Sequence, residues 1–493
     1  MPGPGLAKYA EDAMKVQKRN FSLMALAAVL LAASMCGAAT TKHAASLPAA
    51  KSDEVVAAMV SDIHFDPFED PTKVARLDHA ALSEWKSILA EPMAADHESR
   101  FAALNSSCHF KGADTDFALL TSAMQALRLH AKDAAFATLS GDLLAHDFRC
   151  RYEKALPGGK NYASFAAKTI EFVMAEVRSA LPGKPLYAAL GNNDSDCEDY
   201  QLDANSGFFA ELKQSFLQDV PAAERADAEK SFAETGSYAV HLPPPMSSTR
   251  LIVLDDLFLS KNASTCSARK DPKAAETVRA YLAAELAAGA GQETKWVMAH
   301  IPPGIDPYST ILKMRDICGG QRPEFFLGSD ALREELTKQP VALAIFAHTH
   351  LDEIRLLHSD DGQQKIAAKL VPSVSPIHGN HPSFVLARIT AKTATVRDYR
   401  VVASAAMNDP RAEWKTLYDF DQLYAQKSFD AAAVESLLES FRKEPEGRAS
   451  EAYLGHVQTG EKSTPLALFW PEYACTLGTT TEAGLRQCMC PAK

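Results

Sequence analysis

Short β-branched or apolar runs alternate with amphipathic helical stretches from residue 53 to about residue 400. This alternation constrains the fold most, because it is typical of a layered α/β architecture in which helices cover sheets. The predicted strands cover residues 55–61, 135–139, 186–190, 250–254, 295–299, 341–346, 367–371, 384–389 and 393–400. The predicted helices between them include residues 117–131, 162–181, 272–288 and 329–339.

The two ends of the chain differ from this region. Past residue 405 the pattern indicates helices without strands, first over 419–443 and then in a cysteine-bearing tail, so we predict a small C-terminal helical subdomain over 405–493. At the other end, three basic residues from Lys15 to Arg19 directly precede the apolar run 21–35. This pattern predicts a signal peptide over residues 1–40, with a retained signal anchor or a misplaced start site as alternatives.

The net charge of the chain limits the classes of partner that it can bind. With 51 basic and 62 acidic residues the formal net charge is −11, which argues against a broad patch for nucleic acid or an anionic membrane. Outside the leader no stretch of similar length is continuously apolar, so we expect no membrane span in the mature chain unless the leader is retained. An anionic substrate would then have to be attracted locally, and bound cations are the simplest means.

Nine cysteines are present, and one of them, Cys36, lies inside the leader. The remaining even number behind a leader predicts disulfides and a secreted, periplasmic, endomembrane or lysosomal location. Sequence does not determine the pairing. We expect a bond between Cys266 and Cys318, and a local knot in which Cys475, Cys488 and Cys490 share one further partner. Buried free thiols are the alternative if there is no leader.

Polar residues with ligand chemistry directly follow several of the predicted strands. In open α/β sheets, loops beyond the carboxyl ends of the strands converge on one edge, where ligands bind. The five clusters are Asp62-Ile63-His64, Gly141-Asp142, Gly191-Asn192-Asn193-Asp194, Ala299-His300 and Ala347-His348-Thr349-His350. A single histidine or a Gly-Asp pair is usually structural. Five such clusters in one chain instead favour a binuclear metal site.

The order and content of these clusters resemble the calcineurin-like metallophosphoesterase superfamily over residues 53–400. Three segments are similar to its acid sphingomyelinase-like branch, which also carries a leader, cysteines and a C-terminal helical subdomain. They are Asp62-Ile63-His64-Phe65-Asp66, Gly141-Asp142-Leu143-Leu144-Ala145-His146-Asp147 and Ala299-His300-Ile301-Pro302-Pro303-Gly304. The resemblance implies an α/β fold with a layered β-sandwich flanked by helices.

The resemblance also implies a ligand set for two divalent metal ions, with Asp142 as the bridge. One ion would be held by Asp62, His64, Asp142 and His350, and the other by Asp142, Asn192, His300 and His348. Imidazole nitrogen and carboxylate oxygen without thiolate suit zinc, and manganese and iron are alternatives.

The activity implied is hydrolysis of phosphate esters or anhydrides by metal-activated water, as in an acid sphingomyelinase-like phosphodiesterase. His146 matches a site histidine of that branch and is our candidate acid or phosphate contact. Asn193 replaces the usual histidine of the superfamily pattern and can hydrogen-bond phosphate without donating a proton. His378 and His381, which follow another apolar run, are candidate substrate-binding residues at the rim.

The substitution at Asn193 leaves the substrate open. Some relatives resembling endopolyphosphatases also have Gly-Asn-Asn-Asp, so an endopolyphosphatase or a nucleotide phosphohydrolase is the alternative to a phosphodiesterase acting on a phospholipid. In each case the partner is an anionic phosphate-containing small molecule, lipid or polyphosphate. A metal-bearing protein that binds such a ligand with weak activity is the non-enzymatic alternative.

Overall fold

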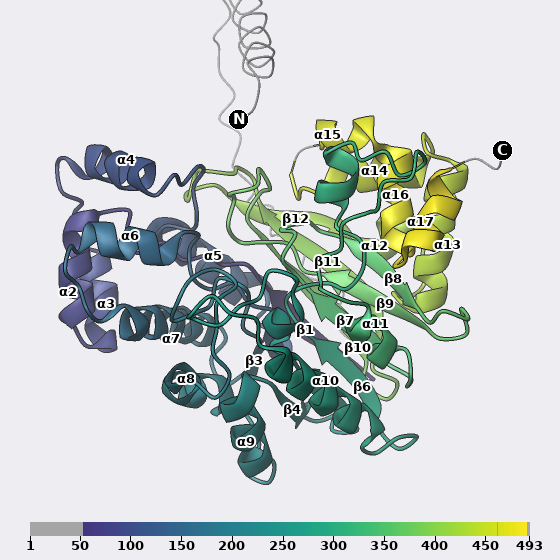
Figure 1. The fold of residues 1–493 in the computed structure, drawn as a ribbon, viewed down its shortest axis with the longest axis horizontal. Coiled ribbons are helices and arrows are strands. Elements are labelled where there is room, and N and C mark those ends of the chain that lie inside the picture. Colours follow the sequence, from purple (N-terminus) through teal and green to yellow (C-terminus); the bar gives the residue numbers. More distant parts are fainter. Residues whose placement is uncertain (1–52, 461, 491–493) are drawn as a thin grey trace, which may run out of the picture. The chain divides into compact units, whose positions relative to one another are not determined.

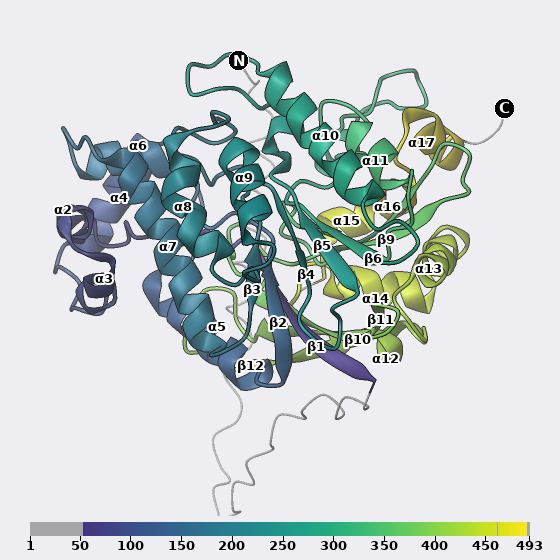
Figure 2. The same cartoon turned by 90° about the horizontal axis from the view of Figure 1, so that it is seen from below.

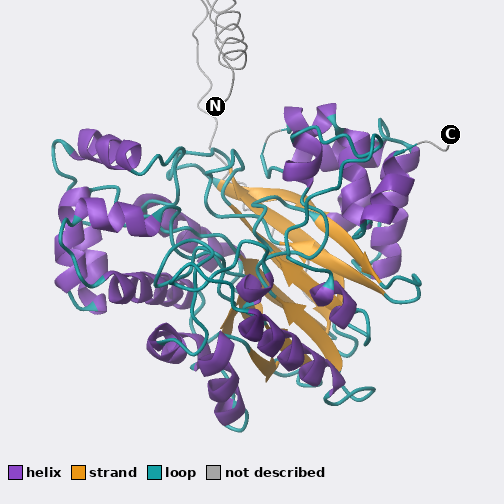
Figure 3. Cartoon of the chain, viewed as in Figure 1, coloured by secondary structure: helices purple, strands orange, loops and turns teal. Residues whose placement is uncertain are grey.

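The computed structural model describes residues 53–460 and 462–490. The predicted signal peptide or anchor at residues 1–40 lies outside this part of the chain. Within it, two six-stranded sheets occupy the interior and helices surround them (Figures 1 and 3). An α/β sandwich flanked by helices is therefore confirmed as the fold class. The same residues contain no helix that is both long enough and apolar enough to cross a membrane.

The first sheet has the order β12-β11-β10-β1-β2-β3. Strand β1 is parallel to β2 and antiparallel to β10, so the sheet is mixed. Its strands are β1 (Glu54–Val60), β2 (Ala134–Leu139), β3 (Leu186–Ala188), β10 (Ser383–Thr390), β11 (Thr395–Ser404) and β12 (Trp414–Asp419).

The second sheet has the order β4-β5-β6-β7-β9-β8, with a parallel centre and an antiparallel strand at each edge. Its strands are β4 (Tyr238–His241), β5 (Thr249–Val253), β6 (Thr294–Met298), β7 (Leu343–Phe346), β8 (Ile354–His358) and β9 (Lys365–Leu370). All nine strands expected from the sequence are present within a few residues, and β4, β8 and β12 are additional.

The core lies between the two sheets. Phe136 on β2 and Trp296 on β6 bring their rings to a centroid distance of 6.3 Å across the interface. The indole of Trp296 also donates a hydrogen bond of 3.0 Å to the carbonyl of Ala394, in the turn between β10 and β11. Both aromatic residues are fully buried, so the sheets share one hydrophobic core and their strand ends are held in a fixed relation.

Helices cover the outer sides of the sheets, as the second view shows (Figure 2). Helices α5 and α7 pack together, α8 contacts β3, and α13 and α16 pack on β8. The helices of the first half are α2 (Val74–His79), α3 (Leu82–Leu89), α4 (His97–Ser107), α5 (Phe117–His130), α6 (Phe148–Ala155), α7 (Tyr162–Ala180), α8 (Gly207–Leu217), α9 (Arg225–Thr235) and α10 (Pro272–Ala287). Those of the second half are α11 (Ala331–Leu336), α12 (Phe420–Tyr424), α13 (Ala431–Lys443), α14 (Arg448–His456), α15 (Thr464–Leu468), α16 (Trp470–Gly478) and α17 (Glu482–Met489). Short helical turns are η1 (Pro71–Lys73), η2 (Asp256–Leu259) and η3 (Tyr308–Leu312).

One strand lies where the sequence indicated helices alone. Strand β12 falls inside the 405–493 range and pairs with β11, so the first sheet extends into the region predicted to be a helical subdomain. The single helix expected over 419–443 is divided into α12 and α13, because Ala425 adopts a left-handed conformation with φ 56° directly after α12. The boundary at residue 405 itself stays a prediction.

Four disulfides connect the eight cysteines that the sequence analysis left outside the leader. They are Cys108–Cys150, Cys197–Cys266, Cys318–Cys490 and Cys475–Cys488. The predicted Cys266–Cys318 bond is therefore wrong, because the chain brings Cys266 beside Cys197 instead. The knot of the last three cysteines with one partner is confirmed, and that partner is Cys318.

Candidate metal centre

The predicted ligands lie in loops that follow five strands, β1, β2 and β3 of the first sheet and β6 and β7 of the second. The structure brings these loops to one place. The ligand atoms of Asp62, His64 and Asp142 lie within 4.8 Å of one another, and so do those of Asp142, His300 and His348. Asp142 belongs to both groups, which is the geometry that a bridging carboxylate requires.

Individual distances place Asp142 between the two groups. Its Oδ2 atom lies 3.4 Å from Nε2 of His64 and 3.1 Å from Nε2 of His300. On one side, Nε2 of His64 is 3.1 Å from Nε2 of His350. On the other side, Nε2 of His300 is 3.1 Å from Oδ1 of Asn192. The seven predicted ligands therefore form one continuous cluster, which Asp62 joins through a distance of 3.5 Å to Nε2 of His350.

The donor atoms of this cluster fit metal ions. His64 Nδ1 donates to the carbonyl of Leu144 at 2.8 Å, and His300 Nδ1 to that of Ser140 at 2.8 Å. In the neutral rings both Nε2 atoms then carry lone pairs, which point at other acceptors. Both side-chain oxygens of Asp62 are buried and accept no hydrogen bond from the described residues. Buried acceptors that converge without donors are stabilised by a cation.

Burial and neighbouring charges set the charge states of the cluster. It lowers the pKa of His348 to about 3 and that of His64 to about 4, so both rings are neutral at physiological pH. Burial raises the pKa of Asp62 to about 7. It acts in the same direction on Asp142, but His300 and His64 outweigh it and lower the pKa of that carboxyl. Burial also acts to lower the pKa of His300, but the carboxylate of Asp142 outweighs it and raises that pKa to about 10. His64, His348 and the bridge therefore already have the forms that ligate metals, whereas a cation must displace a proton from His300 and favour the ionised form of Asp62.

The backbone is strained where the ligands lie. Five of the seven ligand residues have positive φ angles between 44° and 72°, a conformation that side chains other than glycine rarely adopt. They are Asp62, His64, Asp142, His348 and His350. Next to them, a Cβ atom on Gly141 or Gly191 would collide with the facing loop or with His300. These two glycines allow the loops after β2 and β3 to approach each other closely.

Acidic residues that the sequence analysis did not single out support the ligand loops. Asp194 accepts hydrogen bonds from the backbone N–H groups of Leu143 and Gly191 at 2.7 and 2.9 Å, and so joins the loops after β2 and β3. Asp256 accepts from the backbone N–H of Ile301 at 3.1 Å and supports the loop after β6. Asp194 ends the Gly-Asn-Asn-Asp motif, so its position in that motif was the available signal, whereas Asp256 follows β5 without one.

His146 lies beside the cluster. Its ring stacks on that of His64 at a centroid distance of 4.1 Å, and its Nδ1 lies 3.1 Å from Oδ1 of Asp114. Burial lowers the pKa of His146, but the carboxylate of Asp114 outweighs this effect and raises it to about 9. Asp114 also accepts hydrogen bonds from the backbone of His146 and from the hydroxyl of Ser375. The histidine is therefore held by a buried acid that the sequence pattern did not reveal.

The other predicted site residues take different positions. Asn193 faces the bridging carboxylate, because its backbone N–H and its Nδ2 donate to the two oxygens of Asp142 at 2.9 and 3.0 Å. His378 lies at the cluster, with its ring centroid 4.5 Å from that of His350. His381 is not brought to the cluster. Its Nδ1 lies 2.9 Å from the carbonyl of Ser404, and its ring contacts the backbone of Gly460 closely enough to leave no room for a Cβ there.

A cavity of about 480 Å³ opens beside the cluster. His348 and His378 line it together with residues of the loops after β6 and β7 and of the C-terminal helices. The wall is rich in apolar and aromatic side chains, and neither lysine nor arginine lines it within the described ranges 53–460 and 462–490. The apolar lining residues include Tyr308, Leu312, Phe326, Leu351, Leu466 and Tyr473.

Comparison with known proteins identifies the family of the chain. Residues 57–352 match the family profile described as calcineurin-like phosphoesterase. The chain is 22% identical over 348 residues to acid sphingomyelinase-like phosphodiesterase 3b of Homo sapiens, which covers 66% of this chain and 70% of that relative.

Two solved structures are also similar to the chain. GAP50, described as the anchor in the inner membrane complex of Plasmodium, has a TM-score of 0.32 at 10% identity and covers 74% of this chain and 87% of its own. PhoD has a TM-score of 0.36 at 10% identity and covers 76% and 70%. TM-scores this low carry no information on the site. The profile match spans more than half of the sequence, and the chain thus belongs to the calcineurin-like phosphoesterase family of metal-dependent phosphoester hydrolases.

Proposed function

We propose that the protein is a phosphodiesterase that works at a binuclear centre. Asp62, His64 and His350 hold one ion, Asn192, His300 and His348 hold the other, and Asp142 joins the two. The observation that supports this arrangement most directly is the position of Asp142 Oδ2, which lies within 3.4 Å of a histidine nitrogen from each group. Zinc suits a donor set of imidazole and carboxylate without thiolate.

The residues around the centre divide the remaining tasks. Divalent cations, when bound, activate water and neutralise charge on the phosphoryl oxygens. His146, held in place by Asp114, donates a proton to the leaving oxygen. Asn193 keeps the carboxylate of Asp142 oriented, and His378 contacts the substrate where the cavity meets the cluster. This use of Asn193 explains why its amide can replace a histidine without removing the proton donor, which is His146.

The cavity supports a substrate with an apolar or aromatic substituent. A polyphosphate chain carries charge along its whole length, and a wall without lysine or arginine gives it no counter-charge beyond the metal ions. A phosphodiester of a lipid or a nucleoside instead buries apolar area against Tyr308, Phe326 and Leu466. We therefore place a phosphodiester ahead of polyphosphate as the substrate class.

The disulfides support a location in an oxidising compartment. Four bonds in one chain persist outside the reducing cytosol, so we propose a secreted or lumenal protein.

A substrate panel tests the proposal. The purified protein is assayed on bis-p-nitrophenyl phosphate, sphingomyelin, ATP and polyphosphate, each with and without a chelator. We expect chelator-sensitive hydrolysis of the diesters, with polyphosphate the poorest substrate. Preferred cleavage of polyphosphate would overturn the assignment of substrate class, and binding of these compounds without turnover would overturn the catalytic proposal.

A matched pair of variants tests the role of the cavity wall. Tyr308 is 62% exposed and lines the cavity, whereas Met314 is 74% exposed and lies six residues further along the same loop outside it. We expect Tyr308→Ala to raise KM for diesters with apolar groups about tenfold, because the variant loses one apolar contact with the bound substrate. Met314→Ala should leave KM unchanged, and equal effects of both variants would contradict a substrate site in this cavity.

A further inference from the structure

The loop of residues 192–203 connects two of the candidate ligands to one short stretch of chain. Asn192 Nδ2 donates to Oδ1 of Asp199 at 2.7 Å, and the amide oxygen is left 3.1 Å from Nε2 of His300. The next residue, Tyr200, donates its backbone N–H to the carbonyl of Asn192 at 3.0 Å. Its hydroxyl lies 3.3 Å from Nε2 of His348. Adjacent residues thus contact both an amide and an imidazole of the cluster.

These contacts select which atom of each ligand faces the centre. An asparagine side chain offers a metal only its oxygen, and a flipped amide would direct its N–H groups at the cation. The carboxylate of Asp199 accepts hydrogen bonds and donates none, so it pairs with the NH₂ end and keeps the oxygen on the other side. The hydroxyl of Tyr200 occupies Nε2 of His348 and leaves Nδ1 for an ion.

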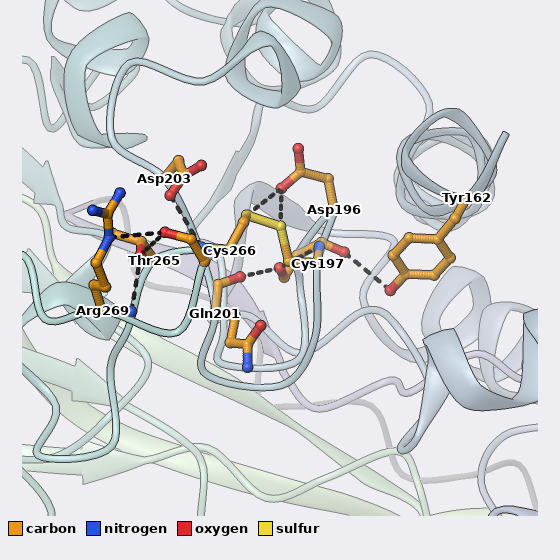
Figure 4. The surroundings of a disulfide bond; sticks show 10 residues. Tyr162, Asp196, Cys197, Gln201, Asp203, Thr265, Cys266 and Arg269 are labelled. Carbon is orange, nitrogen blue, oxygen red and sulfur yellow. Dashed lines mark hydrogen bonds between the residues drawn. A yellow bond between two sulfur atoms is a disulfide. The ribbon is translucent and has the colours of Figure 1, made fainter. Parts of the chain in front are cut away.

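A disulfide and a short backbone ladder fix this loop. Cys197, two residues before Asp199, is bonded to Cys266 (Figure 4). Beyond Tyr200, the backbones of Leu202 and Ser264 exchange hydrogen bonds with the facing segment, from Leu202 N–H to Ser264 at 3.0 Å and from Ser264 N–H to Tyr200 at 2.9 Å. The loop is therefore held on both sides of the two residues that contact the ligands.

The same region does not form a metal site of its own. The side chains of Asp196, Cys197 and Cys266 lie close enough to suggest one. However, the two sulfur atoms are bonded to each other, so neither is a thiolate that could ligate a metal. The disulfide acts through the backbone that it holds.

We propose that Asp199 and Tyr200 are positioning residues that orient Asn192 and His348 toward one of the two metal ions, and that the Cys197–Cys266 disulfide holds them in place. This inference rests on the binuclear centre proposed above. It concerns only the ion that Asn192 and His348 hold. Asp62, His64 and His350 have no hydrogen bond to residues 197–203 among those that the structure describes, so their ion should bind independently of the loop.

Metal titration of the full-length chain tests the proposal. Zn²⁺ is titrated into metal-free protein by calorimetry, and bound metal is counted by elemental analysis. The wild type should bind two ions. Asp199→Ala should lower the affinity for one ion about 10- to 100-fold, the range found when residues that support a ligand are removed. The affinity for the other ion should stay unchanged. Asp199→Asn retains an oxygen acceptor and should recover part of the lost affinity.

Two controls separate positioning from a general effect of charge or of folding. Asp199 is exposed, so its replacement should leave the unfolding temperature of the metal-free protein unchanged. Its exposed neighbour Glu198 carries the same charge, and Glu198→Ala should leave both affinities unchanged. If Asp199→Ala binds both ions as the wild type does, or if Glu198→Ala weakens binding equally, the positioning role is refuted.

Removal of the disulfide provides an independent arm. The double variant Cys197→Ser/Cys266→Ser should lower the affinity for the same ion as Asp199→Ala does. The double variant Cys475→Ser/Cys488→Ser in the C-terminal helices should leave that affinity unchanged. An unchanged isotherm for the first double variant would refute the role of the bond. Failure of the binuclear proposal is distinguishable from these outcomes, because it appears in the wild type itself as fewer than two bound ions.

Discussion

Two regions of the molecule bury carboxylates, one after β1 and one after β7, and the partners of these carboxylates differ. In the metal cluster, Asp62 has two buried side-chain oxygens that accept no hydrogen bond from the described residues. Two residues after His350, the carboxylate of Asp352 accepts hydrogen bonds from Nζ of Lys369 and from the hydroxyl of Tyr418. The carboxylate of the next residue, Glu353, accepts hydrogen bonds from two nitrogens of Arg355 at 2.9 and 3.0 Å. It also accepts one from a tyrosine hydroxyl of α16.

The difference shows how a metal centre is distinguished from a structural ion pair. Both regions are acidic and buried, so burial alone does not separate them. In the structural network each carboxylate has a protein cation and a hydroxyl donor, and the charge is compensated within the chain. In the cluster, Asp62 faces a histidine nitrogen and accepts no hydrogen bond from the described residues, so an external cation is the compensation that its charge needs. We expect the two regions to respond oppositely to loss of metal and to loss of charge.

Removal of metal should have the largest effect, and it should act on the cluster alone. Chelation should lower hydrolysis of bis-p-nitrophenyl phosphate about a thousandfold or more, since the ions contribute several kcal/mol to stabilising the transition state. The unfolding temperature should fall as well, because the ions bind only the folded chain. Activity is measured before chelation, after it, and after Zn²⁺ is restored. Turnover that persists in chelator would remove the distinction between the regions.

Loss of one cation should act strongly on the structural network. Lys369→Met leaves the buried carboxylate of Asp352 unpaired and should lower the free energy of unfolding by about 3–5 kcal/mol. Urea denaturation measures this change. The double variant Asp352→Asn/Lys369→Met removes both charges and should recover part of the loss, while metal content stays at the wild-type value in all folded variants.

The same substitution in the two regions should have opposite signs. Asp62→Asn should weaken metal binding at least about 10-fold, because a direct ligand matters no less than the groups behind it. In chelator it should leave the free energy of unfolding unchanged or raise it by about 1 kcal/mol, since an unpaired buried charge is removed. Asp352→Asn, the matched control, should lower it by leaving Lys369 unpaired. Denaturation of both variants in chelator measures these changes. If both variants lowered the free energy of unfolding, the comparison would be contradicted.

The smallest effect should come from a single hydroxyl. Tyr418→Phe removes one hydrogen bond to Asp352 and leaves the ion pair with Lys369 intact, so it should lower the free energy of unfolding by about 1.5 kcal/mol. Calorimetric titration with Zn²⁺ should give wild-type affinities for both ions. A change in those affinities would show that the two regions are coupled through the short segment between His350 and Asp352.

Most strands that the sequence revealed lie inside a sheet, and all those that it missed lie at an edge. Eight of the nine predicted strands lie inside a sheet, where burial on both faces favours a continuous apolar run, and the ninth, β3, lies at an edge but is itself buried. The three that were missed, β4, β8 and β12, all lie at sheet edges. Edge strands are short and carry polar residues, so their pattern is weak. In β8, for example, Arg355 and His358 interrupt the apolar run.

The same contrast holds for the site. The seven candidate ligands were predicted because each follows a strand closely, and a strand fixes the place where its loop begins. Asp114, Asp199 and Tyr200 were missed because they lie in longer loops whose course depends on contacts distant in sequence, such as the one from Ser375 to Asp114. The predicted Cys266–Cys318 pair failed for the same reason, since Cys318 bonds to Cys490, 172 residues away.

That long-range bond also makes a large part of the chain a closed ring. The ring begins at Cys318, after His300, and returns at Cys490, so the segment with His348 and His350, the last strands of both sheets and the helices from α11 to α17 lie inside it. A protease that cuts the ring once opens it without separating the two pieces, since the sulfur bridge still joins them. The C-terminal helices that line the cavity therefore stay attached to the enzyme after such a cut.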